Sequence, residues 1–231
     1  MSATKAAEPR RLYQQIADDI RELIDKGLFQ AGDRLPPERD LAQQLGVSRP
    51  SLREALIALD VQGHVEIRGG SGVYVSRPPQ GPAARKRTPA LGESPRELMQ
   101  ARAALESAVV VIACAHGTRE QIRKLAEIID GMREEIGHNR APMELDRRFH
   151  LTLCEMSGNA VMGHLIAELF HERHSPISAK LSSRYENSRT WKAALKEHEA
   201  ILRAVESRDP IAAQAAMLSH LRASELRWVG D

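Results

Sequence analysis

The chain has 231 residues, a formal net charge of +2 and an apolar content of 42%, of which little is aromatic. This length accommodates two domains, and the near-neutral charge argues against a protein that binds nucleic acid without regard to sequence. The longest apolar run, residues 108–115, is too short to span a bilayer, no hydrophobic signal segment opens the chain, and only two cysteines are present, so we expect a cytoplasmic protein without disulfides or membrane contact.

Residues 1–10 are predicted to be disordered. Apolar residues then recur at helical spacing, from Leu12 through Ile16 to Ile20. This periodicity predicts an amphipathic helix over residues 11–26. We expect this helix to support the elements that follow it.

Residues 35–56 are predicted to form two short helices joined by a tight turn. Gly46 suits the left-handed end of the first helix, and Ser48 suits the cap of the second. Two short helices with a glycine turn also occur in many all-helical proteins. The layout is nevertheless that of a helix-turn-helix, whose second helix presents its first residues to the major groove of DNA. The positions expected to be exposed on that helix are Arg49, Ser51 and Arg53.

A glycine-rich hairpin signal follows at residues 64–75, where two short β-prone runs flank the turn. It predicts a small wing that carries Arg68. Helix, helix-turn-helix and wing in this order make a winged helix over residues 11–76, which we interpret as a DNA-binding domain. Residues 1–77 contain eleven Lys or Arg and eleven Asp or Glu, so the charges cancel and we expect base readout and dimerisation to matter alongside phosphate attraction.

The text LPPERDLAQQLGVSRPSLREAL at residues 35–56, followed by GHVEIRGGSGVYV at 63–75, resembles the DNA-binding domain of GntR-type bacterial transcription regulators, in particular their FadR-like branch. The resemblance covers the N-terminal third of the chain. It implies that the arginines of PER, VSR and LRE and the tip of the wing contact DNA. With two serines from the start of the second helix, the candidate DNA-binding residues are Arg39, Ser48, Arg49, Ser51, Arg53, Arg68 and Gly69.

Prolines, glycines and the basic cluster at residues 85–87 mark residues 77–93 as an exposed linker. The basic cluster either touches DNA phosphates or is simply solvated. Beyond the linker, helical periodicity and capping signals continue without a convincing strand signal. The predicted fold is therefore mainly α: a winged helix-turn-helix, followed at residues 94–228 by an all-α bundle of six or seven helices.

The bundle holds residues with metal-binding chemistry. Asp146 and His150 are four residues apart and therefore share one helical face. His198 and His220 lie on two successive helices, whose antiparallel hairpin can bring them to one height. Three imidazoles and a carboxylate favour a divalent cation, zinc first, with nickel or manganese as alternatives. The competing interpretation is that nine histidines are scattered through a helical protein, most of them solvated or hydrogen-bonded.

The texts QARAALESAVVVIACAHGT, DRRFHLTLCEMSGN and KEHEAILRAVESRDPIAAQAAMLSHL resemble the helical effector-binding domain called FCD, which follows winged helices of this branch. In that family the Asp and His of a D-x-x-x-H motif and two later histidines bind a metal. The resemblance therefore implies a metal held by Asp146, His150, His198 and His220.

The same resemblance implies that Arg102 pairs with a carboxylate of an effector, for which a bidentate and permanently charged guanidinium is suited. The alternative is a surface arginine on an amphipathic helix. Asn159 matches the family's SGN text but is equally explained as a helix cap. The wording DRRFH and SPISAKL is similar to relatives that sense sugar acids such as hexuronates.

These features predict a homodimeric transcription regulator, for which repression relieved by an effector is the usual arrangement. Two copies would read the half-sites of an inverted repeat in operator DNA, and a small carboxylate would bind near the metal. Three alternatives stay open: a regulator that senses the metal itself, a structural metal without an effector, and a metal-dependent hydrolase or lyase fused to a DNA-binding domain. The enzyme is disfavoured because no base is spaced like the Glu of H-E-x-x-H, and Glu199 points to a different face from His198.

Overall fold

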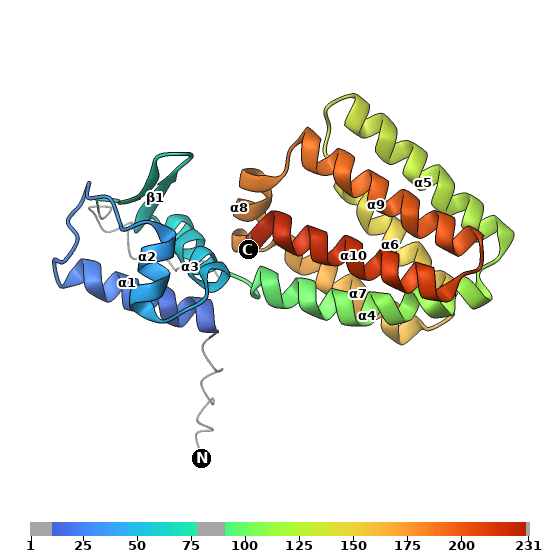
Figure 1. Cartoon of the computed structure of the whole chain (residues 1–231), viewed down its shortest axis with the longest axis horizontal. Helices are drawn as coiled ribbons and strands as arrows, with labels where there is room; N and C mark the ends of the chain where they lie inside the picture. The colour runs from blue at the N-terminus through green and yellow to red at the C-terminus, as the bar shows by residue number, and fades with distance from the viewer. Residues whose placement is uncertain (1–10, 78–90, 230–231) are drawn as a thin grey trace, which may run out of the picture. The chain divides into compact units, whose positions relative to one another are not determined.

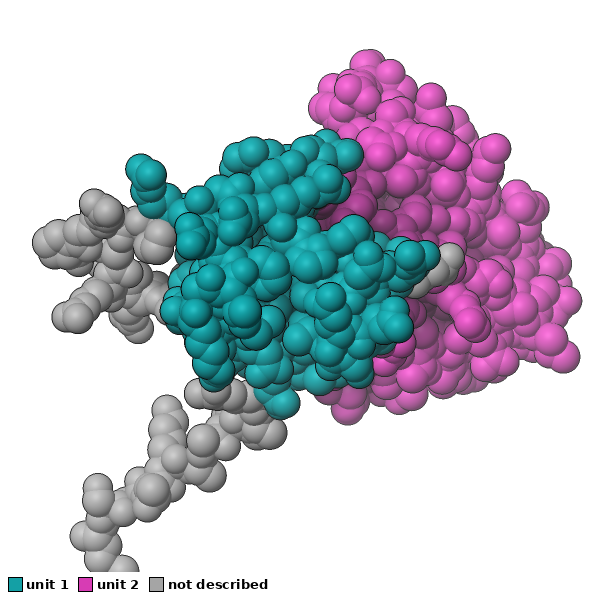
Figure 2. All heavy atoms as spheres, turned by 60° about the vertical axis from the view of Figure 1, so that its left-hand side comes forward, with its two compact units in different colours: residues 1–94, 231 teal, residues 95–230 magenta. Residues whose placement is uncertain are grey.

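The computed structural model describes residues 11–77 and 91–229, and it divides the chain into two compact units that meet in sequence between Ser94 and Pro95 (Figures 1 and 2). Each unit has its own hydrophobic core. The predicted disordered start at residues 1–10 and the basic cluster at residues 85–87 lie outside the described residues.

Within residues 11–77, three helices precede a two-stranded antiparallel hairpin, which confirms the predicted winged helix (Figure 1). The elements are α1 (Leu12–Asp25), α2 (Glu38–Leu45), α3 (Arg49–Val61), β1 (Val65–Arg68) and β2 (Gly72–Val75). In the hairpin Val65 lies opposite Val75, and Arg68 lies opposite Gly72. The apolar faces of α1 and α3 pack together, with Ile20 and Leu52 fully buried between the helices and the hairpin.

The turn between α2 and α3 has the local chemistry that the sequence predicts. Gly46 ends α2 in the left-handed region with φ of 67°, where a side chain would be strained. The Ser48 hydroxyl caps α3 by accepting a hydrogen bond from the Ser51 N–H at 3.2 Å. These two devices fix where the second helix of the helix-turn-helix begins.

The last residues of the predicted linker belong to the N-terminal unit and are not exposed. Leu91 is buried, and the Tyr13 hydroxyl donates to the Gly92 carbonyl at 2.8 Å. The Ser94 hydroxyl donates to both carboxylate oxygens of Glu54, at 3.0 and 2.9 Å. Because Glu54 lies on α3 and is buried, the residue just before the second unit is fastened to the second helix of the helix-turn-helix.

Residues 95–229 form seven α-helices and one short 3-10 helix, as expected for the all-α domain (Figure 1). These elements are α4 (Pro95–His116), α5 (Arg119–Gly137), α6 (Met143–Ser157), α7 (Ala160–His171), η2 (Glu172–His174), α8 (Pro176–Tyr185), α9 (Ser188–Glu206) and α10 (Pro210–Val229). One boundary differs from what the sequence indicates, since the pattern after Asn159 predicts a helix that reaches about residue 174. The chain leaves α-helical geometry at His171 and tightens into η2 before Pro176.

The helix caps of this unit are those that the sequence indicates. Thr118 and Gln121 form a reciprocal capping box at the start of α5, and Gly158 ends α6 in the left-handed region with φ of 70°. The Asn159 side chain accepts from the Met162 N–H at 3.1 Å, which assigns Asn159 as the cap of α7.

Helix α4 packs against α6, α7, α9 and α10, while α5 lies across α6 and α9 (Figure 1). Val110, Phe149 and Ile201 are fully buried where α4, α6 and α9 meet. This arrangement places α6, α9 and α10 around a common interior, so polar residues on their inner faces must meet there.

One helix is long and apolar enough to cross a membrane by length and composition alone, namely α4, whose best window has a mean hydropathy of 1.5. Half of that window is buried inside the protein. The helix also carries the charged pair Arg102 and Glu106 on its buried side. Core helices of water-soluble proteins commonly meet the same criteria, so this finding does not indicate a membrane protein.

Candidate metal centre and DNA-reading elements

The candidate DNA-binding residues on α3 are less uniformly exposed than predicted. Arg49 is exposed, but the expectation for Ser51 is wrong, since only 6% of it is exposed and its hydroxyl lies 2.8 Å from that of Ser48. Arg53 is also not a free surface residue. Its side chain is 14% exposed and donates from Nη2 to the Glu38 carboxylate on α2 at 2.9 Å. The pair holds the Arg53 guanidinium at the junction of the two helices.

The remaining candidates are exposed. The Arg39 side chain is 84% exposed and contacts Asp40 only loosely, at 3.2 Å. Arg68 ends β1 beside exposed Gly69, and its guanidinium lies 4.3 Å from the centre of the Tyr74 ring. Stacking on an aromatic face keeps an arginine extended, and Arg68 Nη2 also donates to Glu66 at 2.8 Å.

The four predicted metal ligands come together. Each of the four side chains offers one oxygen or nitrogen atom, and these four atoms all lie within 4.8 Å of one another. Three helices supply the four side chains. The His198 Nε2 atom is 3.2 Å from Asp146 Oδ1 and 3.3 Å from His150 Nε2. The cluster consists of Asp146 and His150 on α6, His198 on α9 and His220 on α10.

Each imidazole is oriented by a partner at its other nitrogen. The Nδ1 atom of His198 donates to the Ala194 carbonyl at 2.8 Å, and that of His220 donates to Glu197 at 2.9 Å. The Nδ1 atom of His150 is paired with Glu106. Carbonyl and carboxylate oxygens only accept hydrogen bonds, so each Nδ1 carries the proton and each Nε2 offers a lone pair. Such outer partners are the usual way in which proteins set the tautomer of metal-binding histidines.

The donor set fits a cation. Two imidazole lone pairs that face each other at 3.3 Å repel unless something positive lies between them. A zinc ion with bonds of roughly 2.05 Å at tetrahedral angles holds its ligand atoms roughly 3.3 Å apart. Two of the observed separations, 3.2 and 3.3 Å, are close to this value, the His150 Nε2 to Asp146 Oδ1 separation is 3.8 Å, and all four atoms lie within 4.8 Å of one another. Nitrogen-rich sites with one carboxylate suit zinc, and also nickel or manganese.

The titration behaviour of the cluster favours the metal-binding protonation states. Burial lowers the pKa of His220 to about 3, so its ring is neutral at pH 7. Burial would raise the pKa of Asp146, but its contact with the His198 ring and the charge of Arg173 outweigh burial and hold that pKa well below its usual range. Neutral imidazoles and an ionised carboxylate are the forms that bind metals.

Arg102 is buried, which excludes the interpretation as a surface arginine. Its side chain is 3% exposed, its Nε donates to Glu106 at 2.6 Å, and its guanidinium lies 4.0 Å from the centre of the Phe170 ring. The Nη2 atom is buried and has no hydrogen-bond partner among the described residues. Burial of Glu106 would raise its pKa, but Arg102 and His150 outweigh burial and lower the pKa to about 2. One carboxylate thus links the arginine to a metal ligand.

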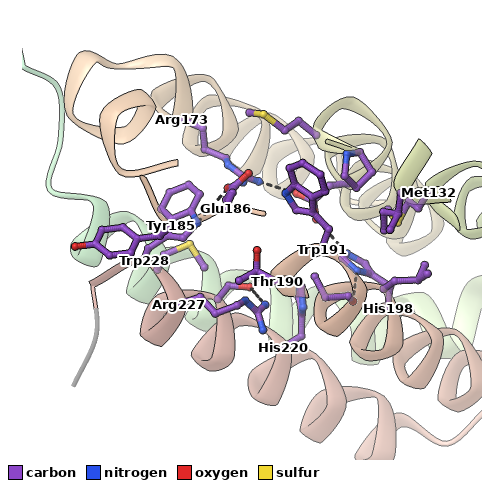
Figure 3. A pocket seen from close by; sticks show the side chains of 18 of the residues that line it. Met132, Arg173, Tyr185, Glu186, Thr190, Trp191, His198, His220, Arg227 and Trp228 are labelled. Carbon is purple, nitrogen blue, oxygen red and sulfur yellow. Dashed lines mark hydrogen bonds and ion pairs between the residues drawn. The ribbon is translucent and has the colours of Figure 1, made fainter. Parts of the chain in front are cut away.

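Arg102 and three of the four cluster residues line a common cavity of about 700 Å³, a volume that includes the opening to solvent. Figure 3 shows this cavity. Asp146, His198 and His220 contribute to its wall. Ligand sites of small molecules are typically concave, largely apolar and supplied with a few converging polar groups, and this cavity has that character.

Comparison with known proteins follows the same two-part division. Residues 12–75 match the bacterial regulatory proteins of the gntR family, and residues 97–223 match the FCD domain. The chain belongs to the GntR family of bacterial transcription regulators. It is a DNA-binding regulator with an FCD domain and not an enzyme, so the hydrolase or lyase alternative is excluded.

Relatives of this GntR-family regulator extend over nearly its full length. It is 36% identical over 222 residues to the Exu regulon transcriptional regulator of Escherichia coli (strain K12), covering 95% of this chain and 85% of the relative. It is 37% identical over 229 residues to the Uxu operon transcriptional regulator of the same strain, covering 95% and 86% of the two chains.

Solved structures of low sequence identity share the fold. The E. coli protein McbR/YncC aligns with a TM-score of 0.51 and 18% identity, covering 94% of this chain and 96% of that one. A GntR family member from Pseudomonas syringae pv. tomato str. DC3000 aligns with a TM-score of 0.51 and 23% identity, covering 95% and 86%.

Three residues of the site in this GntR-family regulator were not identified from the sequence. Glu106 has a signal, because it lies four residues after Arg102 in an otherwise apolar helix and so shares its face. Arg173 has none: its Nη1 reaches across to Asp146 Oδ2 at 2.7 Å from 27 residues away. Glu197 was visible only as the neighbour of His198, and it proves to orient His220 and to accept two hydrogen bonds from Arg227.

The other predictions about isolated residues hold. Five histidines without a partner pattern in the sequence, which favours either a surface or a packing role, are exposed. Glu199 pairs with Arg133 at 2.9 Å. Both cysteines are free and buried, as expected for core residues in the absence of a disulfide. The exposed histidines are His116, His138, His164, His171 and His174.

Proposed function

We propose that the protein is a homodimeric repressor whose hold on operator DNA is released by a small carboxylate, a sugar acid, bound next to a divalent metal in the FCD domain. The observation that carries this proposal is the position of Arg102. Its buried guanidinium has a free Nη2 and lines the same cavity as His198 and His220. A protein rarely leaves a buried charged donor unpaired unless a ligand completes it.

The metal would be held by Asp146, His150, His198 and His220, with zinc as the first choice. When bound, it supplies a positive charge and a coordination position for the carboxylate or hydroxyl oxygen of the effector. Arg102 then provides a second, bidentate contact to the same anionic group. The cavity favours this arrangement over a purely structural metal or a pure metal sensor, because neither requires a hollow lined by an unpaired arginine.

The assignment of a sugar acid is supported by the relatives. The chain shares 36% and 37% identity with the Exu and Uxu regulators over most of its length. This similarity over most of the chain supports a shared mode of control, in which the FCD domain senses the effector and the winged helix responds. A DNA-bound regulator of this kind acts in the cytoplasm.

Dimerisation is supported by an apolar surface on the C-terminal unit. Val161 and Leu165 on α7 are 71% and 48% exposed, and α7 packs beside the outer face of α4, where Ala104 and Ala108 are exposed. Small residues allow two helices to approach closely, and large exposed apolar residues favour burial against a partner. In our proposal a second copy of this chain covers this surface. The resulting dimer has two winged helices, one for each half-site of an inverted repeat.

On DNA, Arg49 is proposed to contact bases at the start of α3, while Arg39 and Arg53 flank it. Arg68 and Gly69 are proposed to contact the adjacent groove or backbone from the wing. Ser48 is exposed and keeps its proposed DNA contact, whereas buried Ser51 acts through the cap that sets the start of α3.

The test is a gel shift with metal-loaded protein and the DNA upstream of its own gene. We expect a specific complex that D-galacturonate or D-glucuronate dissolves. The Arg102→Ala variant should bind the DNA equally well and fail to release it. Release of Arg102→Ala at the same sugar-acid concentration as the wild type would contradict the effector site, and the absence of any specific complex would contradict the regulator's assignment to this DNA.

A further inference from the structure

Aromatic residues are scarce in this chain but concentrate in the cavity. Only two tryptophans and three tyrosines occur among 231 residues. Both tryptophans, Trp191 and Trp228, and one tyrosine, Tyr185, line the cavity that also contains the metal-binding histidines. Three different elements, α8, α9 and α10, supply them, so the cluster does not arise from a single apolar helix face.

Two of the aromatic residues, Tyr185 and Trp228, lie at the other end of the cavity from His198 (Figure 3). Figure 3 shows Tyr185 and Trp228 on one side of the view and His198 on the opposite side, with Trp191 and Thr190 between them. A ligand anchored at the metal by its carboxylate would therefore extend its remaining atoms toward the aromatic residues.

The aromatic region also contains polar atoms that suit hydroxyl groups. The Trp191 Nε1 atom is buried and has no hydrogen-bond partner among the described residues. The Trp228 Nε1 atom donates to Glu186 Oε1 at 3.1 Å, and Arg173 Nη2 approaches the same oxygen at 3.3 Å. The Arg173 Nε atom is buried and unpaired within the part of the chain that the structure describes.

We propose that Tyr185, Trp191 and Trp228, together with Glu186, form a subsite for the neutral, hydroxyl-bearing body of the effector. This inference rests on the proposed function, because it takes the carboxylate of the effector to lie at the metal and Arg102. It adds the residues that distinguish a sugar acid from a short carboxylic acid.

The proposed ligand class follows from the chemistry of these groups. Flat aromatic faces pack against the C–H faces of a sugar ring, while the indole N–H donates to a hydroxyl. Glu186 accepts hydrogen bonds, so it suits hydroxyl donors and opposes anions. An aliphatic ligand of the same size would leave the buried Trp191 Nε1 without a hydrogen-bond partner.

The charges around the cavity further indicate a ligand with one carboxylate. Among the described side chains that line the cavity or contact its ligand cluster, three guanidinium groups face four carboxylates. The surplus of one negative charge becomes one positive charge when a divalent cation binds, and a single carboxylate neutralises it. A second carboxylate would restore a net negative charge in the cavity and would lie near the Glu186 carboxylate, which is unfavourable. The groups are Arg102, Arg173 and Arg227, with Glu106, Asp146, Glu186 and Glu197.

The experiment is calorimetry on the full-length, metal-loaded protein with three probes. D-galacturonate presents one carboxylate and a hydroxylated ring, lactate presents a carboxylate and one hydroxyl, and galactarate presents a carboxylate at both ends. The variants are Trp191→Phe, which keeps a flat ring and removes the N–H, and Trp191→Leu, which removes both. Met143→Leu is the matched control, because Met143 also lines the cavity and has no hydrogen-bonding side chain.

We expect D-galacturonate to bind more tightly than lactate and galactarate. Trp191→Phe should weaken D-galacturonate about threefold to tenfold, the effect of one hydrogen bond. Trp191→Leu should weaken it about tenfold to hundredfold, as for removal of a buried aromatic contact. The lactate affinity and the bound metal, measured by elemental analysis, should not change, and Met143→Leu should match the wild type.

Equal affinities of the wild type for D-galacturonate and lactate would overturn the subsite, and so would an equal loss of both affinities in Trp191→Phe. Galactarate that binds as tightly as D-galacturonate would overturn the inference of a single carboxylate. In each of these cases the proposed function still stands if the wild type binds lactate and the Arg102→Ala variant does not. If neither probe binds the loaded protein, the effector site itself is wrong.

Discussion

Glu106 is the residue whose replacement tests the site most directly, because it contacts both the proposed effector arginine and a proposed metal ligand. Its carboxylate accepts from Arg102 Nε at 2.6 Å and is paired with His150 Nδ1, and its side chain is only 2% exposed. Glu106→Gln keeps the shape of the side chain and removes its charge. The amide also has only one accepting oxygen for two donors, so either Arg102 or His150 then faces an NH₂ group.

The magnitude follows from two independent considerations. A pKa of about 2 in place of 4.5 corresponds to roughly 3 kcal/mol of favourable interaction with the ionised form. Breaking a buried ion pair by removing one partner costs about 3–5 kcal/mol. Because the pKa of Glu106 is lowered in the folded state, its contribution is complete above pH 4.5 and is lost as the pH falls toward 2. We therefore expect Glu106→Gln to lower the free energy of unfolding at pH 7 by about 3 kcal/mol.

The assay is guanidinium denaturation of the metal-free protein followed by tryptophan fluorescence. Trp191 and Trp228 are the chain's two tryptophans and both lie in the C-terminal unit, so the signal reports on that unit alone. Chelator competition then measures metal affinity, which should fall about 10–100-fold because His150 loses its orienting partner. Glu127→Gln is the control: this glutamate is 67% exposed, and its replacement should change the unfolding free energy by less than about 0.5 kcal/mol.

The reasoning would be refuted if Glu106→Gln unfolded at the wild-type guanidinium concentration with wild-type metal affinity. A loss of stability with unchanged metal affinity would support the stabilising role of the buried ion pair and would refute the role of Glu106 in orienting His150.

The remaining predictions concern the metal, the DNA, the dimer and the docked linker. His198→Ala should weaken metal binding more than about 100-fold, and retention of a full equivalent by elemental analysis would exclude His198 as a ligand. Arg49→Ala should weaken operator binding about 10–100-fold in a gel shift while the unfolding free energy stays within about 0.5 kcal/mol; unchanged binding would remove Arg49 from the interface. Leu165→Glu should convert a dimer to a monomer in light scattering, and a persistent dimer would place the interface elsewhere. Ser94→Ala removes the hydroxyl that donates to both oxygens of buried Glu54 and should destabilise the N-terminal unit by about 1–3 kcal/mol in calorimetry. An unchanged transition would make this contact energetically neutral.

Local chemistry in the sequence was sufficient to place most of the elements. Gly46, Ser48, Thr118 and Gly158 act at helix ends through their own backbone or the next turn, so their effect does not depend on distant residues. The four predicted metal ligands were also readable, because their chemistry is rare and an i, i+4 pair on one helix fixes half of the set. The end of α7 was misplaced because no strong breaker precedes Pro176, and the chain tightens gradually through η2.

Only the tertiary structure decided which charged residues are buried and what they contact. From sequence periodicity alone, Arg102 could lie either in a pocket or on the surface. Periodicity also predicted Ser51 and Arg53 to be exposed, but the capping contact covers Ser51 and packing against α2 covers Arg53. Arg173 reaches Asp146, and Trp191 and Trp228 meet in one cavity, through the packing of helices that are distant in the chain. Helical periodicity identifies which residues share a face, but the partner of that face is set by how helices pack. The residues proposed as metal ligands were therefore identifiable from the sequence, whereas the cavity around them is determined by the fold.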